Sequence, residues 1–268
     1  MLEDTSILIT YKHDSGARAR NLATVVNHLL KTTESPIYLY HMGPAPLRDF
    51  KDQQLVNYFF EEEENSLLAN PLFHRTRYIN KLLEKVKTEV TLVLDADVIL
   101  TRSNVVEAES LIKKGIYDVV YPYSLGLNQI PVPENVVSHS LAPLACDPTL
   151  IGKQYLEVFW DTMHNEMSGL GEYERCLYGH AFCINTRAYR KVKGENELFL
   201  PGMPEDRERY YRFRQRGLRV THLNSSYVVH LNHPTSSSNV SSAHQLSEAE
   251  PGFLSFLNTT HNPSLQEL

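Results

Sequence analysis

Two acidic residues at the end of a buried run are the feature of this sequence that most directly indicates chemistry. Asp95 and Asp97 interrupt the segment Thr91–Leu100, TLVLDADVIL, whose first residues are typical of a buried strand. Carboxylates in such a place are unfavourable unless a positive charge offsets their desolvation. A divalent cation held between protein carboxylates and diphosphate oxygens is a common solution. The D-x-D spacing is frequent by chance, so the surrounding elements decide whether it marks a site.

A second acidic pair, Glu205 and Asp206, begins the charged run EDRERYYRFRQRG. This pattern predicts the start of a helix, where the helix dipole favours negative charge and is expected to keep both carboxylates ionised. A carboxylate within hydrogen-bond reach of a hydroxyl can act as a general base. Further along, His230 lies at the end of the strand-like segment SYVVHL and His233 comes shortly after it, and the two compete for the role of metal ligand.

The elements that must position these residues are predicted by hydrophobic periodicity. We expect strands at 6–11, 36–40, 56–60, 91–95 and 117–123, with helices over 22–30, over 79–86 and from about Ser103. This alternation predicts an α/β fold with a mostly parallel sheet flanked by helices. Ligands of such sheets bind beyond the carboxyl ends of the strands. Tyr11, Lys12 and the two aspartates are therefore expected on one rim.

The C-terminal half is less regular. Residues 124–150 contain four prolines and are expected to form a long loop, followed by a helix near 155–163. A helix over 207–216 should end at Gly217, and strands are expected at 218–223 and 226–231. The chain from about residue 235 is Ser-rich and aperiodic. We therefore expect one domain over 1–235 and a tail over 236–268.

Composition excludes several classes of protein. The net charge of -6, without a long basic run, argues against a nucleic-acid partner. No run of about 18 apolar residues is present, so we expect no membrane span. The first residues, MLEDTS, are unlike a signal peptide. The three cysteines fit no zinc spacing, and we interpret them as reduced thiols of a cytoplasmic protein.

Four segments match, in order, the pattern of a known family. Phe73, Arg75, Arg77 and Asn80 fit F-x-R-x-[KR]-x-x-N, and the D-x-D segment follows. The Glu205–Asp206 pair is followed by Arg212 and Gly217 at the expected spacing, and His230 ends a later strand. Over about residues 5–235 the chain resembles the GT-A glycosyltransferases, especially the inverting β-1,4-galactosyltransferase and chondroitin-polymerase-like branch of family 2. The resemblance implies a Rossmann-like GT-A fold.

The resemblance also implies a role for each matching residue. Asp206 would be the general base and Glu205 a partner of the acceptor hydroxyl. Asp97 and His230 would ligate Mn²⁺ or Mg²⁺, and Asp95 would reach the ribose or sugar and is a further candidate ligand. The nucleotide-sugar contacts that it implies are Thr10, Tyr11, Lys12, Phe73, Arg75, Asn80, Asp95, Ala96 and Gly179.

The activity implied by the resemblance is an inverting, metal-dependent transfer of a hexose of the Gal, GalNAc or Glc type. The donor would be a UDP-sugar and the acceptor a carbohydrate hydroxyl, in polysaccharide or surface-glycan synthesis. The sequence departs from the family in three places. No Trp precedes the acidic pair, Asp14 replaces an Arg in the first loop, and only one glycine, Gly179, stands at the family's flexible glycine pair. A retaining GT-A transferase and a non-catalytic glycan- or nucleotide-binding protein remain as alternatives.

Overall fold

The computed structural model describes residues 4–47, 50, 53–62, 73–125, 127–132, 174–175, 178–199, 205–224 and 226–233. Its strands are β1 (Thr5–Lys12), β2 (Ile37–Gly43), β3 (Val56–Glu62), β4 (Val90–Asp95), β5 (Val98–Ile99), β6 (Val119–Tyr121), β7 (Leu127–Val132), β8 (Glu174–Arg175), β9 (Ala181–Asn185), β10 (Val220–His222) and β11 (Val228–Leu231). Its helices are α1 (Gly16–Thr32), α3 (Arg75–Leu83), α4 (Arg102–Lys113), α8 (Thr186–Lys191) and α9 (Glu205–Gln215).

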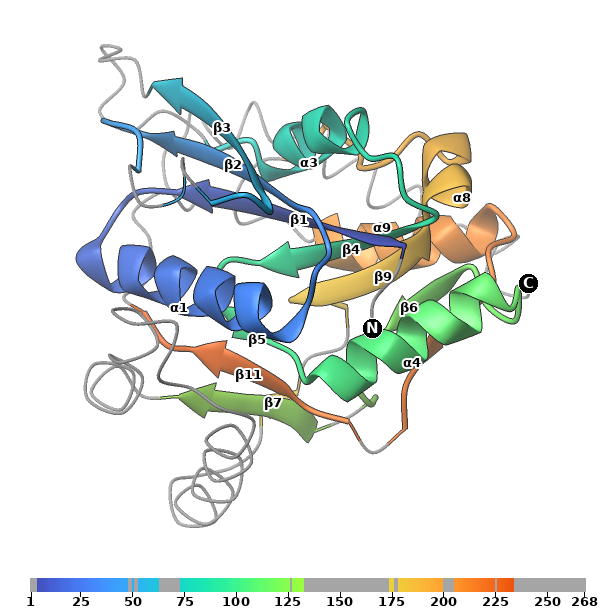
Figure 1. Cartoon of the computed structure of the whole chain (residues 1–268). Coiled ribbons are helices and arrows are strands. Elements are labelled where there is room, and N and C mark those ends of the chain that lie inside the picture. The colour runs from blue at the N-terminus through green and yellow to red at the C-terminus, as the bar shows by residue number, and fades with distance from the viewer. Residues whose placement is uncertain are drawn as a thin grey trace, which may run out of the picture.

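A seven-stranded sheet forms the centre of the molecule, in the order β10-β6-β9-β4-β1-β2-β3 (Figure 1). The pairs β1–β2, β1–β4, β2–β3 and β6–β10 are parallel, whereas β9 runs antiparallel to both β4 and β6. The predicted mostly parallel sheet flanked by helices is confirmed. The antiparallel β9 and the short helix α8 after it were not expected from the sequence.

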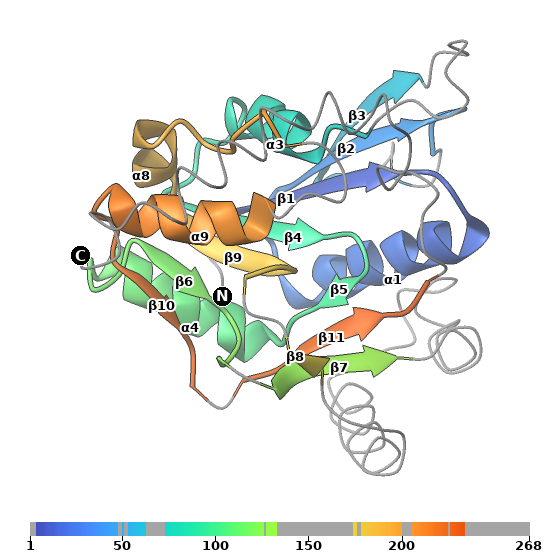
Figure 2. The ribbon, with the colours of Figure 1, turned by 180° about the vertical axis from the view of Figure 1, so that it is seen from behind.

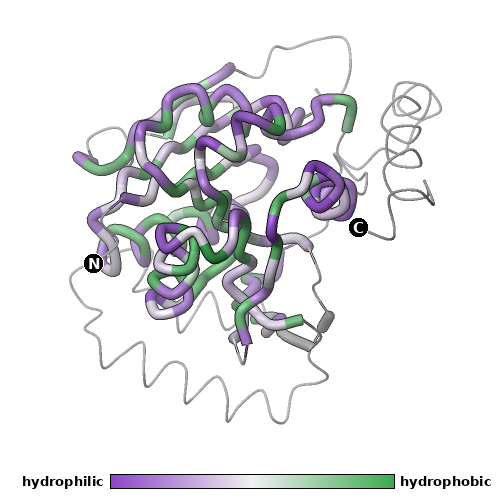
Figure 3. The backbone as a smooth tube through the Cα atoms, turned by 90° about the vertical axis from the view of Figure 1, so that its right-hand side faces the viewer, coloured by the Kyte–Doolittle hydropathy of each residue, from purple (hydrophilic) through white to green (hydrophobic). Residues whose placement is uncertain are grey.

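Helices cover both faces of this sheet. Figures 1 and 2 show α1 and α4 on one face and α9 on the opposite face. Ser15 begins α1 by accepting a hydrogen bond from the backbone N–H of Arg18, and Leu22, Val25 and Val26 of this helix are fully buried. Burying this apolar stripe stabilises the helix, in line with its predicted periodicity. In Figure 3 apolar stretches run through the middle of the molecule and hydrophilic ones follow the outside.

A smaller sheet, in the order β5-β11-β7-β8, lies beside the main one. It corrects one expectation, because residues 127–132 of the predicted long loop form strand β7, which pairs in parallel with β11. The pairing is between segments far apart in the sequence, which local patterns do not predict. The helix expected near 155–163 and the tail over 236–268 lie outside the described residues.

The two sheets meet at the D-x-D turn. Strand β4 ends at Asp95, and the chain turns through Ala96 and Asp97 into β5. Strand β5 pairs antiparallel with β11, which places His230 opposite Val98, and the backbone N–H of Leu231 donates to the carbonyl of Asp97 at 2.8 Å. The backbone therefore fixes the acidic turn against the histidine-bearing strand.

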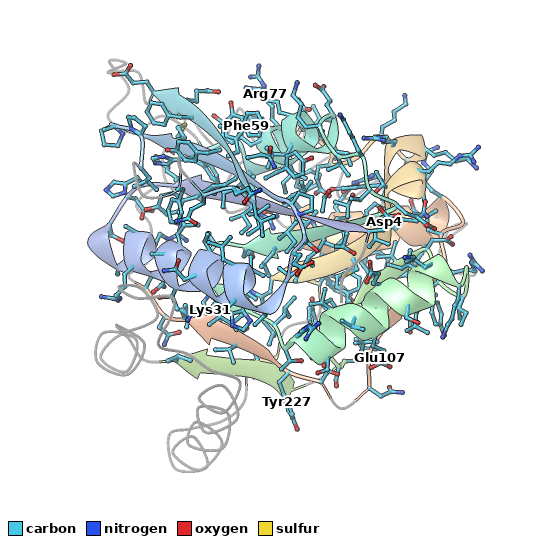
Figure 4. All side chains as sticks on the ribbon, viewed as in Figure 1. Asp4, Lys31, Phe59, Arg77, Glu107 and Tyr227 are labelled. Carbon is cyan, nitrogen blue, oxygen red and sulfur yellow. The ribbon has the colours of Figure 1, made fainter. Side chains whose placement is uncertain are left out.

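The side chains between the sheet and its covering helices form a continuous core (Figure 4). Charged side chains such as Arg77 and Glu107 lie on the outer surface of the helices. Within the described part of the chain, no helix combines the length and the apolar character needed to cross a bilayer.

Candidate active site

Arg75, at the start of α3, joins the two acidic pairs that the sequence singled out. One guanidinium nitrogen, Nη2, lies 2.5 Å from Oδ1 of Asp95. The other, Nη1, lies 3.3 Å from Oδ1 of Asp206 and 3.7 Å from Oε1 of Glu205. The end of β4 and the start of α9 thus converge on one cation. This convergence is the arrangement expected if the pairs belong to one site.

The surroundings of Asp95 keep its carboxyl ionised. Burial alone would raise the pKa of Asp95, but Arg75 and His180 outweigh this effect and hold the pKa well below its usual range. Nδ1 of His180 lies 3.9 Å from Oδ2 of Asp95, and the backbone carbonyl of His180 accepts a hydrogen bond from the Asp95 N–H at 2.9 Å. His180 adopts φ 67°, a left-handed conformation that is uncommon for a non-glycine residue.

Glu205 behaves differently from its neighbour in sequence. Burial, and then the charge of Asp206, raise the pKa of Glu205 to about 8 despite the nearby Arg75. The expectation that the helix dipole keeps both carboxylates ionised is therefore wrong for Glu205, because desolvation and a like charge exceed the effect of the dipole. At neutral pH the Glu205 carboxyl is mostly protonated and can donate a hydrogen bond.

Asp97, His230 and His233 form a group with the chemistry of a metal site. Nε2 of His233 lies 3.0 Å from Oδ2 of Asp97, and Nε2 of His230 lies 3.8 Å from Oδ1. One potential ligand atom from each residue lies within 4.8 Å of the others. Burial lowers the pKa of His230, which leaves its imidazole neutral, the form that ligates metals. The two histidines, which the sequence presented as competitors, can thus act together.

Arg18, in the first turn of α1, lies against this group. Its Nε and Nη2 atoms are each 3.2 Å from a ring nitrogen of His233, and Nη1 lies 3.6 Å from Oδ2 of Asp14. The resemblance implied an Arg in the first loop, where this chain has Asp14. Arg18 brings a guanidinium to the same end of β1 from the following helix.

An aromatic group lies at the ends of β1 and β2. Tyr11 is buried, its hydroxyl lies 3.0 Å from Nδ1 of His13, and its ring centroid is 5.2 Å from that of His41. Burial, and then the neighbouring His13, lower the pKa of His41 to about 4, so this ring is neutral. Gly43 is required here, because a Cβ atom would lie 2.6 Å from Nε2 of His41.

The remaining predicted nucleotide-sugar contacts are divided between the rim and the core. Thr10 is in register with Asp95, and Ala96 lies in the D-x-D turn itself. Lys12 is buried at the end of β1, and the carbonyl of Gly179 accepts a hydrogen bond from Tyr123 at 2.5 Å. Phe73 packs against Tyr78, with ring centroids 5.3 Å apart.

Asn80 faces away from this rim. Its amide donates to the carbonyl of Glu195 at 2.9 Å and accepts from the backbone N–H of Glu195 at 2.7 Å. It also donates to the side chain of Glu197 at 2.8 Å. The structure thus places the Asn80 side chain against Glu195 and Glu197, which lie between α8 and α9, and away from Arg75 and Asp95.

Several residues of the site were not singled out from the sequence: Arg18, His180, Glu195 and Arg209. Arg209 is the clearest case, because it follows Asp206 by three residues on a predicted helix, a spacing at which side chains meet. Its Nη2 atom lies 2.5 Å from Oδ1 of Asp206. Glu195 and His180 gave no comparable local signal, since they reach the site through loops.

Comparison with known proteins shows similarity of structure only. No protein-family model matches the chain, and no curated protein matches it by sequence. S. aureus TarS 1–349, solved in complex with UDP-GlcNAc, is similar with a TM-score of 0.54 and 11% identity, over 98% of this chain and 69% of that one. A second structure of S. aureus TarS 1–349 gives a TM-score of 0.53 at 11% identity, over 98% and 68% of the two chains.

The mannosyltransferase PcManGT from Pyrobaculum calidifontis, solved with GDP-Man and Mn²⁺, has a TM-score of 0.49 at 9% identity, over 94% of this chain and 64% of that one. At such low identity the likeness to TarS concerns the fold. The chain has an α/β fold of the GT-A type, with a seven-stranded, mixed and mostly parallel sheet flanked by helices.

Proposed function

We propose that the chain is an inverting, metal-dependent glycosyltransferase that moves a hexose from a UDP-sugar to a carbohydrate hydroxyl. The observation that carries the proposal is the bridge made by Arg75 between Asp95 of the D-x-D turn and Asp206 of the second acidic pair. This bridge joins the turn that also carries Asp97, a candidate metal ligand, to the start of α9, which carries the candidate base. The fold shared with TarS, solved with UDP-GlcNAc, supports a sugar nucleotide as donor.

The proposed metal site consists of Asp97, His230 and His233. One carboxylate and two imidazoles suit Mn²⁺ better than Mg²⁺, which prefers oxygen ligands. A bound divalent cation would neutralise the negative charge that develops on the diphosphate when the sugar leaves. Asp95, which Arg75 contacts, would accept hydrogen bonds from donor hydroxyls.

The proposed base is Asp206. Its side chain is 33% exposed, so an acceptor hydroxyl can reach it, and two guanidinium groups fix its position. Glu205, mostly protonated at neutral pH, can donate a hydrogen bond to the acceptor. A hydroxyl that loses its proton to Asp206 while attacking the anomeric carbon gives a single displacement, which inverts the configuration. Such a reaction requires one base and no covalent nucleophile.

Calorimetry with UDP tests the donor site. We expect UDP to bind the wild type with Mn²⁺ and not with EDTA, and Asp97→Ala to abolish the metal-dependent binding. Uridine, which lacks the diphosphate, should bind independently of Mn²⁺, and the exposed Glu107→Ala should bind UDP as the wild type does. Undiminished Mn²⁺-dependent affinity in Asp97→Ala would show that the metal binds elsewhere.

UDP release from UDP-GlcNAc, with water and then with oligosaccharides as acceptors, tests the catalytic role. Asp206→Asn should lower kcat by about 10²–10⁴-fold while UDP affinity is retained. Wild-type turnover in this variant would exclude Asp206 as the base, and retention of anomeric configuration in the product would favour a retaining transferase. Donor binding without turnover across a panel of sugar nucleotides and acceptors would identify a non-catalytic binding protein.

A further inference from the structure

Arg209 is a buried cation in contact with the proposed base. Its side chain is 1% exposed, and the guanidinium carbon lies 4.3 Å from the ring centroid of Phe182. Nη2 donates to Oδ1 of Asp206 at 2.5 Å and to the carbonyl of Tyr178 at 3.2 Å. Nη1 donates to Oε2 of Glu195 at 3.0 Å. A guanidinium fixed at both ends in this way has little freedom to move.

Both guanidinium groups contact the same oxygen of Asp206. Arg75 lies 3.3 Å from Oδ1 and Arg209 lies 2.5 Å from it. Among the described residues, no hydrogen bond or ion pair is made to Oδ2 of Asp206. The Asp206 side chain is partly exposed, so Oδ2 is the oxygen that remains for an incoming hydroxyl.

Glu195 holds Arg209 from the opposite side. Its side chain is 1% exposed and accepts a hydrogen bond from the hydroxyl of Tyr189 at 2.6 Å. Its backbone is held by the two hydrogen bonds to Asn80. Arg209 and other charges outweigh burial and lower the pKa of Glu195, so this buried group is an anion. The buried charges of Glu195 and Arg209 therefore offset one another.

We propose that Arg209 is the positioning residue of Asp206, and that Glu195 sets how strongly the charge of Arg209 acts on it. The inference rests on the proposed function, since it concerns the geometry and basicity of the proposed base. A guanidinium beside a carboxylate makes it a weaker base, and an anion behind that guanidinium reduces the effect. Among the residues that the structure describes, the other ionisable groups that interact with Asp206 are Arg75 on α3, Glu205 on α9 and Tyr121 on β6.

The test is the pH dependence of UDP release from UDP-GlcNAc with Mn²⁺. Arg209→Met should move the acid limb of the kcat profile to higher pH by about one unit, because the base then holds its proton more tightly. Glu195→Gln should move the same limb to lower pH, because the guanidinium charge is no longer offset. In Arg209→Met the Asp206 carboxylate also loses its alignment, which should lower the maximum kcat by about ten- to a hundredfold while KM for the donor stays nearly unchanged.

Further variants separate positioning from stability. Removing one partner of a buried ion pair destabilises a fold, so Arg209→Met alone is at risk of unfolding. The double variant with Arg209→Met and Glu195→Gln removes both charges, and it should fold and keep the low kcat and the shift to higher pH. Arg209→Lys should recover part of the activity. The exposed Arg214→Met on the same helix should match the wild type.

The outcomes distinguish this inference from the proposed function. An unshifted acid limb in both the double variant and Glu195→Gln, measured on folded protein, would overturn the role of Arg209 and Glu195 alone. Undiminished turnover in Asp206→Asn would exclude Asp206 as the base and overturn this inference with it. No turnover in the wild type across a panel of UDP-sugars and acceptors would overturn the proposed function as well. Opposite shifts in the two single variants are not expected from a merely structural ion pair.

Discussion

Replacing Glu205 by Gln should stabilise the protein, and the stabilisation should grow with pH. Burial, and then Asp206, raise the pKa of Glu205 from 4.5 to about 8 in the folded chain. Between these two values the folded chain retains a proton that the unfolded chain releases. The unfolded state is therefore favoured as pH rises through this window, and the folded state is favoured below it. Gln cannot ionise, so the variant lacks this pH-dependent loss of stability.

The magnitude follows from the two pKa values. At pH 7 the carboxyl of the unfolded chain is about 2.5 units above its pKa, while the folded one is still mostly protonated. One unit corresponds to about 1.36 kcal/mol, so the difference is on the order of 3 kcal/mol at pH 7 and vanishes well below pH 4.5. In a protein of this size each kcal/mol changes Tm by about 2–4 °C. The expected gain in Tm at neutral pH is therefore roughly 6–12 °C.

Thermal and urea unfolding of the wild type and Glu205→Gln, from about pH 4.5 to about pH 8 without metal or nucleotide, provides the assay. Glu107→Gln, which removes an exposed carboxyl from α4, is the matched control and should show no pH-dependent difference. A difference between Glu205→Gln and the wild type that does not change with pH would refute the argument. If Glu205→Gln became less stable than the wild type as pH rises toward 8, the effect would have the opposite sign to the predicted one.

Two further outcomes follow from the geometry. His230→Ala and His233→Ala should each weaken Mn²⁺ binding by roughly ten- to a hundredfold in calorimetry, and full affinity in either variant would remove that histidine from the site. Gly194→Ala should lower the free energy of unfolding by more than Gly115→Ala does. Both glycines have φ 65°, but only at Gly194 would the new Cβ meet the side chain of Asn80, at 2.3 Å. If urea unfolding showed the same loss of free energy of unfolding in both variants, the Asn80 side chain would have moved aside for the new Cβ atom.

The strands and helices of the first hundred residues could be predicted because each has its own periodic apolar pattern. The apolar run of β1 and the buried stripe of α1 are examples, and their observed bounds contain the predicted ones. Strand β9 was not predicted, although its sequence, AFCIN, is an apolar run. No local pattern indicates that this strand pairs with β4 on one side and with β6 on the other. Strand β7 contains Pro131, which lowers the strand signal, and its partner β11 is distant in sequence.

The site was predictable where a motif residue ends a secondary-structure element. Arg75, Asp95 and Asp206 each lie at the end or start of an element, and the structure brings them together. Asn80 shows why the same motif does not place all of its residues at the rim. It lies five residues after Arg75 on α3, a rotation of about 140° around the helix, so its side chain points to Glu195 instead. Which side chains touch depends on packing between elements.

Charge balance in the described site gives a physical reason for the proposed metal that does not depend on the D-x-D pattern. Around Arg75 and Arg209, the carboxylates of Asp95, Asp206 and Glu195 already outnumber the guanidinium groups, and the charge of Asp206 adds to burial in raising the pKa of Glu205. A diphosphate would add further negative charge to the same rim. A cation that enters with it, in addition to Arg18 at the end of β1, should therefore favour its binding, whereas an uncharged nucleoside needs no such cation. Comparing the affinities of UDP and uridine, each with and without Mn²⁺, thus tests this charge balance directly.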